Sequence, residues 1–100
     1  MEFLTDMVTN VPEGVDEDTV EETKAREAKN SAELARQGHL LRLWKPPIVP
    51  GEWRSLGLWQ ADDEKELDAI MSTMPLHPWM TVEVTPLTPH PSDPGTHPPT

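Results

Sequence analysis

Apolar and polar residues alternate at the beginning of the chain, which predicts a β-strand over residues 2–11. One face of that strand carries Phe3, Thr5, Met7, Thr9 and Val11, and the other carries Leu4, Asp6, Val8 and Asn10. The run Pro-Glu-Gly at 12–14 has turn chemistry and ends the predicted strand.

The pattern becomes helical from Asp16 to Gln37, in a stretch rich in Glu, Lys, Arg and Ala. Asp16 is the expected N-cap, and the acids Glu17 and Asp18 suit the positive end of the helix dipole. Gly38 stands where a glycine commonly ends a helix. The acidic first turn is expected to be a solvated face rather than a metal site.

Two strands are predicted next, at 39–44 and 53–60, joined by a proline-broken connection at 45–52. Both strands carry apolar residues on both faces, which must therefore both be covered. In the strand at 39–44, Leu40 and Trp44 are expected on one face and Leu41 and Leu43 on the other. The strand at 53–60 carries Trp53, Leu56, Leu58 and Trp59.

A second helix is expected to open at Asp62 and Asp63, with Glu66 placed as in a capping box. Pro75 stops it, and residues 80–84 form the last predicted strand. The buried stripe of this helix has helical spacing and consists of Leu67, Ile70, Met71 and Met74.

The element order β-α-β-β-α-β predicts an α+β, ferredoxin-like domain over residues 1–86, with a four-stranded antiparallel sheet and both helices on one face. No sequence remains to cover the other face, so we expect a sheet-to-sheet dimer like the dimeric α+β barrels, within a homo-oligomer of that order or higher. Residues 86–100 are expected to form neither helix nor strand, because prolines remove backbone donors there. Residues 87–100 are thus predicted to be a proline-rich arm or tail.

Composition agrees with an oligomer. A core of roughly 85 residues supplies only a few kcal/mol of net stability, and the 100-residue chain has no cysteine for a disulfide. The absence of cysteine and of a signal-peptide pattern predicts a cytoplasmic protein. The formal charge of −10, from 18 acidic against 8 basic residues, disfavours nucleic-acid and membrane partners.

Lys24 and Glu27 are the candidate catalytic pair. They interrupt the otherwise small or apolar stripe of the first helix, one turn apart. A simple explanation is an i,i+3 salt bridge with both side chains reaching outward. The functional alternative is a carboxylate base beside a cation at the mouth of a pocket between helix and sheet, where a low dielectric sharpens both roles.

Weaker candidates could bind a substrate. Arg42 and Arg54, on the hairpin strands, could hold a carboxylate bidentately, although both are also ordinary surface residues of strands. Each of the four tryptophans is first a core or interface residue, and one or two of them could also wall a pocket. Trp44 and Trp79 are the candidates among Trp44, Trp53, Trp59 and Trp79. His77 lies in the loop before the last strand, where it could line a pocket or simply pack.

Cofactor and metal chemistry finds little support. His39 is expected to be a surface or capping residue, and His90, Asp93 and His97 lie in a proline tail that lacks the rigidity of a metal site. No glycine-rich phosphate loop or Ser-His-Asp order is present. Cofactor-free proton transfer is the chemistry that the side chains support best.

Several local motifs together resemble the muconolactone isomerases of aromatic catabolism, over residues 1 to about 93. They are Met7 and Pro12, Lys24-Ala25-x-Glu27, Gly38 before a strand that ends Leu43-Trp44, Pro75-Leu-x-Pro-aromatic-Met80, Glu83-Val84, and His90-Pro91-Ser92.

This resemblance implies a ferredoxin-like subunit in a large oligomer, typically a decamer. It also implies an enzyme that shifts the ring double bond of muconolactone, a small lactone carboxylate, to give the enol-lactone of 3-oxoadipate without a cofactor. Glu27 would shuttle the proton, Lys24 would stabilise the enolate oxygen or orient Glu27, and an arginine would hold the substrate carboxylate.

The chain departs from the family pattern at Asp6, at Leu41 and in the proline-rich loop after Trp44. These changes touch substrate or interface surfaces and leave the exact lactone open. The alternatives are an enzyme for a substituted or chlorinated muconolactone, and a non-catalytic oligomer that binds small acids.

Overall fold

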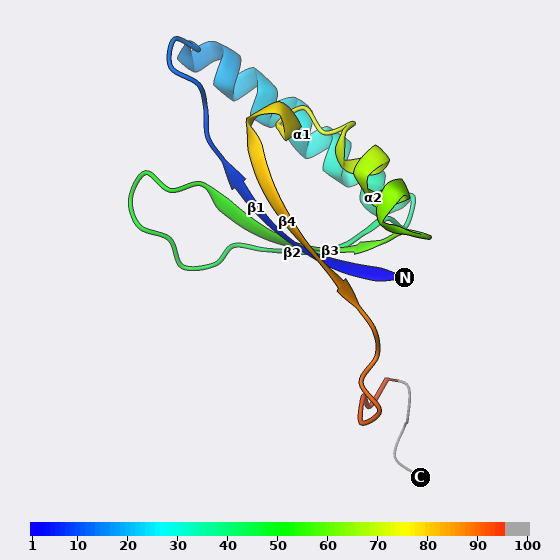
Figure 1. Cartoon of the computed structure of the whole chain (residues 1–100). Helices are drawn as coiled ribbons and strands as arrows, with labels where there is room; N and C mark the ends of the chain where they lie inside the picture. Colours follow the sequence, from blue (N-terminus) through cyan, green and yellow to red (C-terminus); the bar gives the residue numbers. More distant parts are fainter. Residues whose placement is uncertain (96–100) are drawn as a thin grey trace.

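The computed structural model describes residues 1–95, which form a four-stranded antiparallel sheet with two helices on one face (Figure 1). The sheet order is β2-β3-β1-β4, which confirms the predicted ferredoxin-like fold. The elements are β1 (Glu2–Thr9), α1 (Glu17–Arg36), β2 (Leu40–Trp44), β3 (Arg54–Gln60), α2 (Glu64–Met71), the 3-10 helix η1 (His77–Trp79) and β4 (Met80–Leu87).

Helix α1 has the predicted caps. The side chain of Asp16 accepts a hydrogen bond of 2.7 Å from the amide of Thr19. At the other end Gly38 adopts a left-handed φ of +85°, and the amides of Gly38 and His39 donate to the carbonyls of Ala35 and Leu34. This pair of bonds is a Schellman motif, which requires the glycine and turns the chain into β2.

Helix α2 begins at the predicted N-cap, since Asp63 accepts from the amide of Glu66 at 2.8 Å. The side chain of Glu66 reaches back to the amide of Asp62 instead of that of Asp63, so only half of the expected capping box forms. Tight turns continue after Met71 and keep Met74 buried.

The core lies between the helices and one face of the sheet. Its largest members are Phe3 and Met7 of β1, Trp59 of β3, and Leu67 and Met71 of α2. Phe3 and Met7 lie on one face of the first strand, as the alternation predicted, and that face is the one that the helices cover.

The register of β2 differs from simple alternation. An irregularity between Leu40 and Arg42 breaks the pairing with β3. Beyond it Leu43 pairs with Gly57 on the helix-covered face, whereas Trp44 pairs with Leu56 on the other. The expectation that Trp44 shares a face with Leu40 is therefore wrong, because one extra residue in a strand reverses the facing of those that follow.

Strand β4 is longer than predicted and includes Pro86 and Leu87, so the expectation of no strand from residue 86 onward is wrong at these positions. β4 lies at the edge of the sheet, where a proline is tolerated because one side of the strand needs no backbone donor. Beyond Leu87 the chain extends away from the sheet (Figure 1). Residues 96–100 of the predicted tail lie outside the described residues.

Neither α1 nor α2 covers the second face of the sheet, which carries Leu4, Val8, Leu56 and Leu58, all partly exposed. Arg54 and Asp6 form an ion pair on the same face, with the guanidinium Nε 2.8 Å from the carboxylate. The sheet-to-sheet dimer stays a prediction. Within residues 1–95, no helix has the length and apolar character needed to cross a bilayer.

Candidate active site

A cavity of about 250 Å³ lies between α1, the helix-covered face of the sheet and the segment that links α2 to β4. This volume suits a metabolite smaller than the drug-sized ligands that occupy roughly 300–1,000 Å³. Its lining is mostly apolar and consists of Met7, Thr9, Lys24, Glu27, Ala28, Ser31, Leu40, Leu43, Trp53, Ser55, Trp59, Met74, Leu76 and Met80.

Glu27 is the only acidic residue among these lining residues, and it comes from the middle of α1. Its side chain is half-buried, and its Oε2 accepts a hydrogen bond of 3.1 Å from the amide of Leu76. Burial raises the pKa of Glu27, because desolvation outweighs the Leu76 hydrogen bond and the charge of His77, which both act in the opposite direction. A carboxylate of this kind can accept a proton and give it back.

Lys24 is the only cationic residue in the same lining, one turn before Glu27. The predicted salt bridge between the two does not form. The ammonium lies 3.5 Å from Glu21 instead, and 5.1 Å from the ring centroid of Trp53. The Lys24 charge is thus held at the cavity by an exposed carboxylate and an aromatic face, while Glu27 keeps its oxygens for the Leu76 amide and the cavity.

Arg42 and Arg54 do not line this cavity. Arg42 stacks on Trp44, with 5.2 Å between the guanidinium carbon and the ring centroid, and both pair with β3 residues of the uncovered face. Arg54 is held by Asp6, and this hydrogen bond lowers the pKa of the Asp6 carboxyl. The three predicted substrate-binding residues Arg42, Arg54 and Trp44 are therefore on the opposite side of the sheet from Glu27.

His77 and Trp79 lie in η1, next to the cavity but outside its lining. His77 follows Leu76, whose amide binds Glu27, and the His77 charge acts on the pKa of that carboxyl. The carbonyl of Trp79 accepts a hydrogen bond of 2.7 Å from the amide of Asn10, which ties η1 to the end of β1. No group of three or more potential metal ligands gathers within residues 1–95.

Two contributors to the site were not chosen as site residues from the sequence. The first is the amide of Leu76, 49 positions from Glu27, for which no local signal exists. The second is the pair of indoles at Trp53 and Trp59. Trp53, Ser55, Gly57 and Trp59 are spaced two residues apart, so they lie on the same face of the strand, which is the face toward α1. This spacing was the sequence signal that could have assigned both indoles to one pocket.

The combined arrangement favours proton transfer. A carboxyl group with a raised pKa and the ammonium of Lys24 line a small, largely apolar space in which charges interact more strongly than in water.

Comparison with known proteins agrees with this geometry. The family model described as muconolactone delta-isomerase matches residues 1–93. Muconolactone Delta-isomerase 1 of Acinetobacter lwoffii is 33% identical over 92 residues, covering 92% of this chain and 93% of that protein. Muconolactone Delta-isomerase of Rhodococcus opacus is 32% identical over 91 residues, covering 91% and 95%.

The fold is similar as well. The crystal structure of a muconolactone isomerase matches with a TM-score of 0.79 and 27% identity, over 92% of this chain and 93% of that one. From the family match over nearly its whole length, the chain belongs to the muconolactone delta-isomerase family.

Proposed function

We propose that this chain is an isomerase that converts muconolactone to the enol-lactone of 3-oxoadipate, with no cofactor. Its relatives at about 30% identity are muconolactone delta-isomerases. The observation that carries the proposal is the position of Glu27, a half-buried carboxylate with a raised pKa that lines a small cavity on the helix-covered side of the sheet.

In the proposed reaction, the Glu27 carboxylate removes the proton from the ring carbon that bears the side chain of the lactone. The electron pair moves through the double bond onto the lactone carbonyl and gives a dienolate. The Glu27 carboxylic acid then returns the proton two carbons away, so the double bond has moved and no atom is gained or lost. A pKa raised by burial suits this role, since the group must act as base and then as acid.

Lys24 supplies the positive charge. It is the only cationic lining residue, and Arg42 and Arg54 of the same chain lie beyond the sheet. We propose that the ammonium stabilises the negative charge that develops on the lactone oxygen. The indoles of Trp53 and Trp59 exclude water from the ring of the substrate.

We also propose that the working form is a cytoplasmic homo-oligomer built on sheet-to-sheet dimers. The apolar side chains on the uncovered face, including Leu56 and Leu58, support this assembly. Sedimentation velocity measures it directly: a monomer at micromolar concentration would contradict it.

The experiment for the function is to mix purified protein with (S)-muconolactone and follow the loss of its ring proton by NMR, in parallel with Glu27→Gln. We expect rapid conversion by the wild type and a rate about 10²–10⁴-fold lower with the variant. A folded wild-type protein that leaves (S)-muconolactone unchanged would overturn the proposed substrate.

A further inference from the structure

The indole of Trp59 forms part of the cavity wall on the sheet side, and its position is fixed by a buried network. Trp59 is 1% exposed. Its Nε1–H donates to the hydroxyl of Thr5 at 2.8 Å, and that hydroxyl lies 3.4 Å from the carbonyl of Gly57, to which it donates. Thr5 is fully buried and stands opposite Gly57 in the sheet. The indole therefore lies back along β3, over the residue two positions before it.

Because Gly57 has no side chain, the indole of Trp59 can occupy the space above its Cα. A Cβ at this position would stand 2.7 Å from Nε1 of Trp59, 3.0 Å from the Thr5 hydroxyl and 3.1 Å from Cε of Met7. The backbone itself does not call for glycine, because Gly57 is not among the described residues with positive φ. A side chain is excluded here by the ring of Trp59.

The indole borders the cavity, because Trp59 and Met7 are both among its lining residues. The Met7 methyl group can rotate away, since a thioether chain is flexible, but the indole is rigid. A methyl group at residue 57 would therefore push the ring into the cavity and reduce its depth.

We propose that Gly57 determines specificity by setting the depth of the cavity: its missing side chain lets Trp59 lie flat against the sheet, and the substrate ring occupies the space so gained. This inference rests on the proposed function for the identity of the substrate. Its structural part, that residue 57 controls the position of the indole, holds for any ligand of the cavity.

The kinetic test is Gly57→Ala with (S)-muconolactone. We expect KM to rise about tenfold, the effect of one misplaced methyl group in an apolar pocket, with kcat changed less than about threefold because Glu27 is untouched. In a Trp59→Phe background, which lacks the indole nitrogen, Gly57→Ala should change KM less than about twofold. Equal effects in both backgrounds would overturn the proposal.

Gly95→Ala is the matched control, because it adds the same methyl group where the nearest atom is 3.5 Å away and outside the cavity. Should Gly57→Ala fail to fold, Thr5→Val removes the acceptor of the Trp59 N–H at nearly the same volume. It should raise KM with little change in kcat, and an unchanged KM would contradict the proposed control of the indole.

A second readout does not depend on turnover. In a ¹⁵N-labelled protein the Trp59 indole N–H should exchange slowly, and Gly57→Ala should shift its resonance and speed its exchange, unlike Gly95→Ala. An unaffected Trp59 resonance would overturn this inference even if muconolactone is converted. Absence of conversion by the wild type would instead overturn the proposed function.

Discussion

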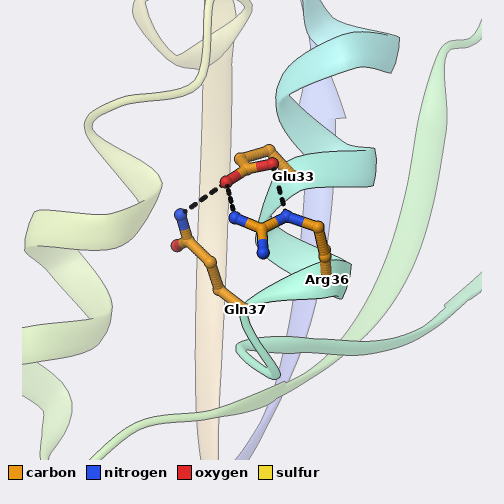
Figure 2. A network of polar contacts seen from close by, with 3 residues as sticks. All are labelled: Glu33, Arg36 and Gln37. Carbon is orange, nitrogen blue, oxygen red and sulfur yellow. Dashed lines mark hydrogen bonds and ion pairs between the residues drawn. The ribbon is translucent and has the colours of Figure 1, made fainter.

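Two of the glutamates on helix α1, Glu27 and Glu33, have surroundings that shift their pKa values in opposite directions. Glu33 is exposed and accepts hydrogen bonds from the side chains of Arg36 and Gln37, which lower its pKa to about 2 (Figure 2). Glu27 is half-buried at the cavity and has one backbone donor, the amide of Leu76, and its pKa is raised.

The difference shows which effect dominates at each place. At the exposed Glu33, the side-chain donors stabilise the carboxylate and outweigh the smaller effect of desolvation. At the cavity, desolvation is stronger than a single neutral hydrogen bond, and Lys24 is engaged with Glu21 instead of Glu27. The same residue type on one helix is thus an anion with a lowered pKa at Glu33, and at Glu27 a carboxyl with a raised pKa, which suits the proposed proton transfer.

The largest expected effect is on turnover. Glu27→Gln removes the base but keeps an oxygen to accept from the Leu76 amide, so we expect kcat for muconolactone to fall by about 10²–10⁴. Glu33→Gln, on the same helix, should stay within twofold of the wild type. Comparable losses in both variants by the NMR assay would mean that the two glutamates do not differ in function.

Lys24 is the next test, because it gives the cavity its positive charge. Lys24→Met keeps the stem that packs near Trp53 and removes the ammonium, so we expect kcat to fall about 10²-fold, as for loss of an oxyanion donor. Lys29→Met changes an exposed lysine of α1 outside the lining and serves as control. A change in KM alone would assign Lys24 to substrate binding instead.

The dependence of activity on pH should follow Glu27 and not Glu33. A base must be ionised, so kcat/KM should fall about tenfold per pH unit below the Glu27 pKa. This fall in kcat/KM should begin at a pH above 4.5, the ordinary pKa of a glutamate side chain, whereas Glu33 remains ionised throughout this range. Rates measured from pH 4 to 8 test this, and a flat profile down to pH 4 would argue against Glu27 as base.

The smallest expected effect is on stability. The folded-state pKa of Glu27 is above its unfolded value, so its favourable contribution is present below the unfolded pKa and is lost as pH rises through the folded pKa. Above that pH, Glu27→Gln should melt a few °C higher than the wild type, and near pH 4 the two should converge. Thermal melts that differ equally at both pH values would refute this linkage.

The sequence predicted what depends on local chemistry. Asp16, Gly38 and Asp63 end or begin helices through bonds to residues within five positions, and those signals can be read directly. The alternation in residues 2–11 also placed Phe3 and Met7 on the same face of the strand, and the structure shows that this face is the buried one.

The strand register and the contacts between residues far apart in the sequence could not be predicted from such local patterns. The irregularity at Leu40/Arg42 reverses the facing of Leu43 and Trp44, and nothing in the order of apolar residues marks it. The spacing of Lys24 and Glu27 suggested a pair, but Glu27 accepts its hydrogen bond from Leu76, in the segment between α2 and η1. Both residues of the candidate pair were predictable as exceptions in a stripe, whereas their partners were not.

The most direct test of the account is a pH titration of the side-chain carboxyl carbons of Glu27 and Glu33 by ¹³C NMR, in the wild-type protein without substrate. The account predicts a Glu27 pKa above 4.5 and a Glu33 pKa of about 2 in the same sample. A Glu27 pKa at or below 4.5 would contradict the claim that the cavity converts this carboxylate into a proton carrier.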